Sequence, residues 1–353
     1  MEIPEVNAIE GDYLQTKRDN LFFDVKGLRH PKDRIISFVR FHPDPEGDRQ
    51  RDNIRYKKIY DIEERYKFLT QYYPQYLFFS KQFDMQIQGV KKSDIKKVYT
   101  PREYLNRLKG RSNLEGIEKD SYDLCMLLIE EGNLAPDSIG ITGSQMIDLN
   151  KEESDIDLVI YGTDTSQNFQ KTLPAIYEGE NGCRRYTFDE YKSHYKFRAG
   201  GSGVSFNDFM KSERRKLHQG FYRGTEFFIR YIKSPKDWED SYIDNQYKNL
   251  GRIRLMAEIS EASDSIFTPA SYQLNVLRIL NLSLTQKDIY LDELDLELIR
   301  TINSYRGRFC EHAKEGELVM AEGKLEKVIY KDQEAYYRVL LGNEKTDKMI
   351  LIS

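Results

Sequence analysis

Alternating apolar and polar positions in the first hundred residues predict a region built mainly of strands. The stretches "LFFDVKGL" and "RIISFVRF" are rich in β-branched and aromatic residues, and the turn-forming "RHPKD" separates them. "IRYKKIYD" and "YLFFSKQF" predict further strands, with a helix between them that begins at Asp61. Ile62, Tyr66 and Leu69 lie on one face of that helix. We therefore expect residues 1–100 to form a β-rich domain with a role in substrate binding.

From Thr100 onward the pattern alternates between helical and extended segments. Thr100, Pro101 and Glu103 have the spacing of a capping box that starts a helix, and "EKDSYDLCMLLIEEG" predicts a second helix. The stretches "DSIGITGS", "SDIDLVIYG" and "TEFFIRYIK" predict three strands, and "SQNFQKTLPAIYEG" predicts a helix between the second and the third. This alternation predicts a domain of mixed helices and strands over residues 101–240.

The last third of the chain carries weaker patterns. We assign residues 241–304 as a helical segment, although the branched residues of "SYQLNVLRILNLSL" also suit a strand. Residues 305–353 alternate and turn like a small β-meander or barrel. The expected fold class is therefore α+β with several domains.

Composition supports a folded chain that does not coat nucleic acid. The 353 residues allow two or three domains of about 100–200 residues, and 25 Tyr and 18 Phe supply apolar surface for their cores. A net charge of −4 argues against nucleic-acid binding along the whole surface but leaves room for a local basic groove.

The cysteines and the apolar runs predict a cytoplasmic protein. Cys125, Cys183 and Cys310 lie far apart, with neither zinc spacing nor a disulfide framework, which suits a reducing compartment. The N-terminal sequence lacks the basic start and apolar core of a signal peptide. No apolar run reaches the roughly 20 residues that a membrane helix needs, so we expect no membrane partner.

Two aspartates stand at the start of an apolar run in "ITGSQMIDLNKEESDIDLVIYG". Asp155 and Asp157 are two residues apart, so on a strand both side chains project to the same side. Two carboxylates this close repel each other unless a cation lies between them, and hard oxygen ligands suit Mg²⁺. The apolar "LVIY" behind them predicts a buried strand that would hold such a site rigidly.

Gly143 and Ser144 end the preceding predicted strand. Glycine lets a phosphate approach the backbone closely, and a serine hydroxyl with the N–H groups of a following helical turn can bind phosphate oxygens. Together with Asp155 and Asp157, the pair predicts a site for a nucleoside triphosphate and its metal. The alternative is a surface strand with solvated aspartates and an ordinary Gly-Ser turn.

The stretch "TGSQMIDLNKEESDIDLVIYG" resembles the signature of the polymerase-β-like nucleotidyltransferase superfamily, and the match covers about residues 138–162. "VKGLRHPKDRII" and "DPEGDRQRDNIRYKKIYD" also resemble archaeal proteins described as predicted nucleotidyltransferases. The resemblance implies a central mixed sheet with helices on one face. It also implies that Asp155 and Asp157 bind two divalent metals, Mg²⁺ or Mn²⁺. These metals would support attack of a hydroxyl on the α-phosphate of a nucleoside triphosphate, with loss of pyrophosphate.

A third carboxylate is the member of this set that the sequence leaves open. Glu226 in "RGTEFFIRYIK" is the candidate for a third metal ligand or base, and an exposed glutamate at a strand start is the alternative. Arg230 could take the third position instead. The chain would then be a catalytically degenerate nucleotide- or RNA-binding protein, or would use the guanidinium on phosphate.

Basic residues are needed for the triphosphate and for a polyanionic acceptor. Arg215 and Lys216 in "FMKSERRKLHQGFYRG" are the candidates for binding the triphosphate, with a solvated helix face as the alternative. The N-terminal strands carry a second basic group interleaved with aromatic residues, which suits single-stranded nucleic acid or ordinary strand patterning. It comprises Lys26, Arg29, His30, Arg34, Arg40, Arg49, Arg51, Arg55, Lys57 and Lys58.

The acceptor is not specified by any motif. An RNA 3′ end, a protein hydroxyl and a small molecule all remain open. The C-terminal strands could form an RNA-binding barrel, but their acids balance their bases, which favours a structural or dimerising role in a homo-oligomer.

Overall fold

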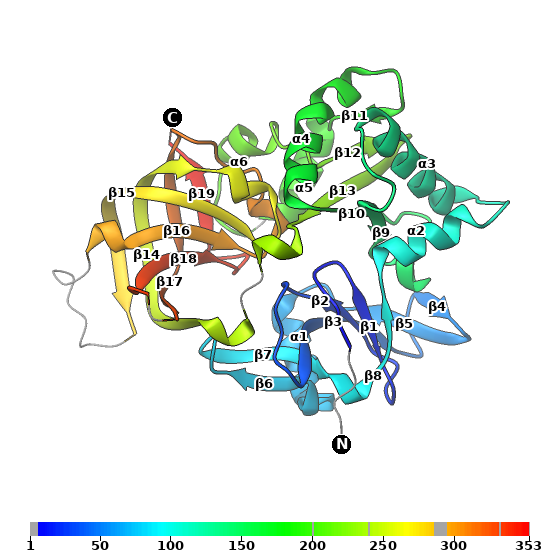
Figure 1. Ribbon diagram of the computed structural model, residues 1–353, viewed down its shortest axis with the longest axis horizontal. Helices are drawn as coiled ribbons and strands as arrows, with labels where there is room; N and C mark the ends of the chain where they lie inside the picture. Colours follow the sequence, from blue (N-terminus) through cyan, green and yellow to red (C-terminus); the bar gives the residue numbers. More distant parts are fainter. Residues whose placement is uncertain (1–5, 200, 239–240, 286–294, 332, 353) are drawn as a thin grey trace. The chain divides into compact units, whose positions relative to one another are not determined.

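The computed structural model describes residues 6–199, 201–238, 241–285, 295–331 and 333–352. The chain divides into two compact units, which differ from the four domains expected. The first contains Met1–Ser80, Met85–Arg184 and His218–Tyr242, and the second contains Lys81–Asp84, Arg185–Leu217 and Ile243–Ser353. Both units mix helices and strands (Figure 1), so the α+β class is confirmed.

An eight-stranded sheet forms the N-terminal part of the first unit. Its main path runs β4-β5-β3-β2-β1-β8, while β7 pairs with β3 and β6 pairs with β7. The strands are β1 (Tyr13–Thr16), β2 (Phe22–Val25), β3 (Arg34–Pro43), β4 (Arg49–Arg51), β5 (Ile54–Lys58), β6 (Leu77–Ser80), β7 (Met85–Lys91) and β8 (Ile95–Tyr99). The helix predicted at Asp61 is α1 (Ile62–Tyr72), where Asp61 accepts hydrogen bonds from the N–H groups of Glu63 and Glu64. Leu69 of α1 lies in the core beneath this sheet.

A five-stranded mixed sheet completes the first unit. Its order is β11-β12-β13-β10-β9, with β10 antiparallel to β9 and parallel to β13. The strands are β9 (Ile139–Thr142), β10 (Ile156–Tyr161), β11 (Cys183–Arg184), β12 (Gln219–Tyr222) and β13 (Thr225–Ile232). The helices around it are α2 (Pro101–Lys109), α3 (Gly116–Glu131) and α4 (Thr163–Glu178).

The two faces of this sheet are covered by different parts of the chain. On one face, Phe169 and Tyr177 of α4 pack their rings on Tyr231 and Phe227 of β13, with centroids 6.4 and 6.2 Å apart. On the other face, Val159, Tyr161 and Ile232 pack against Ile9 and Leu28 from the N-terminal part. This apolar contact explains why residues 1–100 do not separate as a domain of their own.

The second unit is built around a ring of strands. Its sheet runs β14-β15-β16-β18-β17-β19, and a further pairing of β14 with β17 closes the first five into a barrel. Within this ring, β14 pairs antiparallel with both β15 and β17, and β16 pairs parallel with β18. The strands are β14 (Asn245–Glu261), β15 (Ala270–Leu284), β16 (Ile299–Ser304), β17 (Leu318–Tyr330), β18 (Tyr336–Leu341) and β19 (Lys348–Leu351). The helices α5 (Phe188–Ala199) and α6 (Phe206–Glu213) belong to the same unit.

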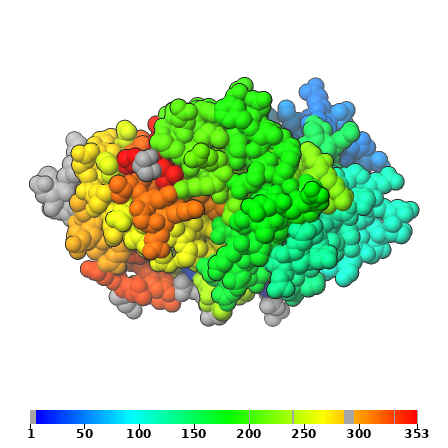
Figure 2. All heavy atoms as spheres, turned by 90° about the horizontal axis from the view of Figure 1, so that it is seen from above, coloured from blue at the N-terminus to red at the C-terminus, as the bar shows by residue number. Residues whose placement is uncertain are grey.

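The helical segment expected over residues 241–304 is wrong for its described part. Residues 245–261 and 270–284 form the two longest of the described strands, and residues 286–294 lie outside the described residues. Leu255, Ala257 and Ile259 point into the barrel core while Arg254 lies exposed, which is a period of two. Bulges at Arg254/Leu255 and Met256/Ala257 interrupt the pairing with β15. Yellow, orange and red atoms lie interleaved in the space-filling view (Figure 2), because distant stretches of sequence form this one barrel.

None of the helices in the described part of the chain is long and apolar enough to cross a membrane.

Candidate nucleotide site

Gly143 is placed where only a glycine fits. It follows β9 with a φ of +79°, which side-chain-bearing residues rarely adopt. Thr142 pairs with Asp157 across the β9–β10 ladder, so the carboxylate of Asp157 lies against the Gly143 backbone. A Cβ atom at position 143 would overlap Oδ2 of Asp157. The Gly-Ser pair and the aspartates are therefore in contact, as their spacing predicts.

Asp155 and Asp157 stand at the start of β10 with Ile156 buried between them. Asp155 is exposed and Asp157 is half-buried. Within the described part of the chain, neither carboxylate has a hydrogen-bond or ion-pair partner. Burial and, secondly, the charge of Asp155 raise the pKa of Asp157 to about 7. A cation bound between the two would remove this repulsion.

Ser144 and Gln145 form the turn that joins the two motifs. The helical turn expected after Ser144 is a single 3₁₀ turn, Gln145–Ile147, so it presents fewer N–H groups than a helix would. The side chain of Gln145 accepts from the hydroxyl of Ser121 and donates to the carbonyl of Asp155 at 3.4 Å. Gln145 therefore positions the main chain at Asp155, a role that no sequence pattern had indicated.

Two arginines of β4 hold the loop that follows this turn. Arg49 Nη1 donates to the carbonyl of Leu149 at 2.5 Å, and Arg51 Nη1 donates to the carbonyl of Ile147 at 2.8 Å. Arg51 Nη2 also donates to the hydroxyl of Tyr99 and lies 3.7 Å from Asp148. The first unit thus ties its N-terminal sheet directly to the Gly-Ser loop.

Arg230 lies on the same sheet face as Asp157. It pairs in register with Val159 on the parallel neighbour strand, and its Nη1 is 2.7 Å from Oε1 of the fully buried Glu10. Lys26 joins this network at 3.1 Å from Glu10 and 2.9 Å from Asp24. The N-terminal segment therefore neutralises Arg230, which offsets the cost of burying its charge.

Glu226 is on β13, two residues before Phe228, and Phe228 pairs in register with Asp157 of β10. Across the described ranges, no three His, Cys, Asp or Glu side chains come together in a group that could hold a metal. The structure therefore does not join Glu226 to Asp155 and Asp157 as a three-carboxylate set. The pair of aspartates alone offers oxygen ligands of the kind Mg²⁺ takes, with its remaining positions left to water and phosphate.

The structure places Arg215 and Lys216 in the second unit and pairs both of them. Arg215 forms a two-pronged ion pair with Glu317 at 2.5 and 2.6 Å and donates to the carbonyl of His312. Lys216 is 1% exposed, and its Nζ lies 2.7 Å from Glu213 and 2.6 Å from the carbonyl of Arg308. These residues are neither a solvated helix face nor groups held ready for a triphosphate.

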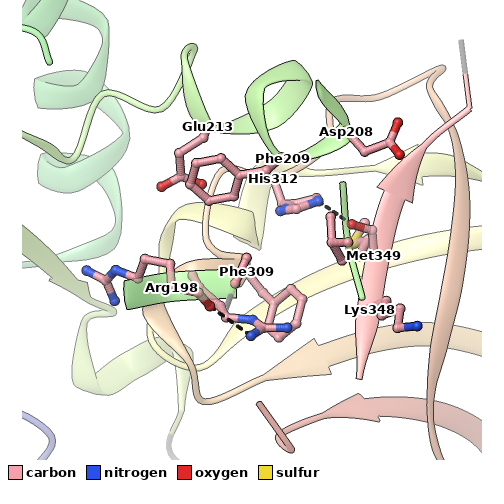
Figure 3. Close-up of a pocket in the computed structure, with 11 residues that line it drawn as sticks. Arg198, Asp208, Phe209, Glu213, Phe309, His312, Lys348 and Met349 are labelled. Carbon is pink, nitrogen blue, oxygen red and sulfur yellow. Dashed lines mark hydrogen bonds between the residues drawn. The ribbon is translucent and has the colours of Figure 1, made fainter. Parts of the chain in front are cut away.

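A hollow in the second unit is too small for a nucleotide. Figure 3 shows it between α6 and the barrel, lined in part by Glu213, Phe309 and His312. Its volume is about 30 Å³, which holds one or two water molecules. The Nε2 atom of His312 lies 2.6 Å from the carbonyl of Met349, so this part of the lining is internally hydrogen-bonded.

Comparison with known proteins adds one relative. A Methanocaldococcus jannaschii protein named "Uncharacterized protein MJ1086" is 27% identical over 342 residues, which cover 95% of each chain. No family model matches the chain, and no solved structure matches it.

Proposed function

We propose that the chain transfers a nucleoside monophosphate from a nucleoside triphosphate to a hydroxyl acceptor in a Mg²⁺- or Mn²⁺-dependent reaction. The observation that carries the proposal is the contact between Gly143 and Asp157, beside an Asp155 that has no partner in the described chain. Folding leaves two carboxylates together, which is costly unless a cation lies between them.

Each residue of the site has one task in this proposal. Asp155 and Asp157 would hold the divalent cation, which supplies positive charge that offsets the charge developing on the phosphate. The open backbone at Gly143 and the hydroxyl of Ser144 would contact phosphate oxygens. The acceptor oxygen forms a bond to the α-phosphorus while the bond from that phosphorus to the α–β bridging oxygen breaks. Pyrophosphate leaves with that electron pair, and the proton of the acceptor hydroxyl passes to water.

A nucleotide- or RNA-binding protein without transfer activity is the second candidate. One observation favours it: in the part of the chain that the structure describes, no third carboxylate joins the pair, while Arg230 lies on the same face. The three free cysteines, all buried, suit a reducing compartment, and we place either activity in the cytoplasm.

Labelled nucleotides separate the two candidates. The full chain is incubated with nucleoside triphosphates labelled on the α- or γ-phosphate, with Mg²⁺ or Mn²⁺, and with RNA, protein and small-molecule acceptors in turn. Transfer predicts that α-label becomes attached to an acceptor and that γ-label leaves as pyrophosphate. Calorimetric binding of ATP with Mg²⁺ but no transferred label across these acceptors would favour the second candidate. Absence of both binding and transfer would overturn the proposal.

A further inference from the structure

Two cations of the N-terminal sheet, Arg40 of β3 and Lys58 of β5, lie next to each other without acidic partners. Lys58 pairs in register with Phe41, the neighbour of Arg40. Both charged groups approach the Tyr60 ring, Lys58 Nζ at 4.8 Å and Arg40 Cζ at 5.6 Å from its centroid. Both residues are half-buried, and no carboxylate among the described residues lies within ion-pair distance of either.

Lys58 also lies beside the residue that binds the loop after Ser144. The centroid of the Phe41 ring is 5.9 Å from Nζ of Lys58 and 5.4 Å from Cζ of Arg49, and Arg49 donates to the carbonyl of Leu149 in that loop. Burial and the charge of Arg40 lower the pKa of Lys58 to about 8.

Other cations of the first unit are paired with carboxylates. Lys26 pairs with Glu10 and Asp24, and Arg230 pairs with Glu10. Arg40 and Lys58 have weaker compensation for their lost hydration: a 3.4 Å hydrogen bond from Arg40 to the carbonyl of Ile59, and the Tyr60 ring. Two cations without carboxylate partners fit a ligand that carries several anionic oxygens.

The position of Lys58 is fixed relative to the Gly-Ser loop. Arg49 of β4 pairs in register with Tyr56 of β5, two residues before Lys58 on the same side of the strand. The side chain of Arg49 also donates to the loop carbonyl of Leu149. Strand pairing between β5 and β4, and the hydrogen bond from Arg49 to Leu149, thus connect Lys58 to the loop after Ser144.

We propose that Arg40 and Lys58 bind the phosphate chain of the nucleotide whose divalent cation Asp155 and Asp157 would hold. This inference rests on the proposed function and assigns the triphosphate contacts to the N-terminal sheet. Ammonium and guanidinium groups both bind phosphate through charge-assisted hydrogen bonds. Tyr60, with 59% of its surface exposed, lies beside them at the rim.

A neighbouring lysine provides the matched control. Lys57 is exposed and lies on the opposite side of β5 from Lys58. Calorimetry measures binding of tripolyphosphate, and of ATP with Mg²⁺, to the full chain. Lys58→Ala and Arg40→Ala are each expected to weaken both by about tenfold or more, as loss of a charged hydrogen bond does. Lys58→Arg should retain most of the affinity, and Lys57→Ala should stay within about twofold of the natural chain.

The outcomes distinguish this inference from the function on which it rests. Equal weakening by Lys57→Ala and Lys58→Ala, in variants whose circular dichroism is unchanged, would overturn it even if nucleotide transfer is observed. Tripolyphosphate binding that depends on Lys58, in a chain that transfers no label, would uphold it while the proposed function fails. If the natural chain binds neither tripolyphosphate nor ATP, both are overturned.

Discussion

In the second unit, Lys216 lies 2.7 Å from Glu213, and Glu213 lies 2.9 Å from Nε2 of His194. In the first unit, Lys58 and Asp157 influence each other's pKa and yet have no ion-pair partner in the described chain. The charges of the second unit are fully buried and paired, whereas Lys58 and Asp157 are half-buried and form no ion pair among the described residues. Paired charges hold a fold together, whereas unpaired opposite charges facing each other indicate a site that a ligand completes.

The largest expected effect comes from removing the two acids. Asp155→Asn combined with Asp157→Asn should lower transfer by about 10³-fold or more, because the cation loses both protein ligands. The fold should keep or slightly raise its melting temperature, since two repelling charges disappear. The assay is transfer of α-label, with thermal unfolding alongside.

The control removes two charges from the adjacent loop. Glu152→Gln with Glu153→Gln alters exposed residues and should leave transfer within about twofold. If this control loses as much activity as the Asp155/Asp157 variant, the effect comes from net charge and not from the site.

Substitution of the buried charges in the second unit should lower the free energy of unfolding. Glu213→Gln leaves Lys216 and His194 buried without their counter-charge and should cost about 3–5 kcal/mol of the free energy of unfolding, measured in urea. Adding Lys216→Met should recover most of that loss, because the buried cation is then gone as well. A Glu213→Gln variant of unchanged stability would show that pairing in this unit is not structural, and the contrast between the units would fail.

Acid should weaken the N-terminal sheet through His30. Its Nε2 lies 2.9 Å from the carbonyl of Ala8, and its Nδ1 accepts from the N–H of Ile36, so the ring is held neutral. Burial lowers the pKa of His30 to about 4 from an ordinary 6.5. The unfolded chain therefore takes up a proton first as the pH falls from 6.5 to 4, and about 3 kcal/mol of stability is lost over that window.

The role of His30 is measured by comparing the pH dependence of stability in the natural chain and in a His30→Gln variant. Urea unfolding at pH 7 and pH 4.5 is compared with the same pair for His30→Gln, whose amide can make both hydrogen bonds without titrating. The comparison isolates His30 from Asp12, whose burial raises its pKa to about 7 and gives a slope of opposite sign. Identical pH dependence in the two proteins would contradict the assignment.

The smallest expected effect belongs to Gly143. Gly143→Ala places a methyl group against the Asp157 carboxylate at a positive φ, and should cost about 1–2 kcal/mol of stability. Mn²⁺ affinity should fall as Asp157 is displaced. Gly224, which also has a positive φ but open space at its Cβ, is the matched control. Its alanine variant should show the strain without the change in Mn²⁺ binding.

Short-range features were predictable from the sequence because their partners lie nearby in the chain. Gly143 and Asp157 are separated by one turn and one loop, and strand alternation places Asp155 and Asp157 on one side. Thr100 likewise caps α2 by accepting from the N–H of Glu103, as the spacing predicts.

Features that depend on distant partners were not predictable. Nothing near Arg215 in the sequence indicates that Glu317, about a hundred residues later, pairs with it. Within the expected helical segment, the strand Ala270–Leu284 resembled a helix because bulges space its core-facing residues Val276, Ile279 and Leu282 three apart. Lys57 and Lys58 look alike in sequence, and only the strand's orientation separates the exposed residue from the half-buried one.

The ion pair between Arg230 and Glu10 has a consequence for dissecting the chain. A fragment beginning at residue 101 would keep every residue of the Gly-Ser and Asp-x-Asp stretch. It would nevertheless lose the acid that neutralises Arg230, and Val159 and Ile232 would lose their apolar cover. The site therefore does not function as an independent fragment: its electrostatic balance depends on Glu10, which lies 145 residues before Asp155 in the sequence.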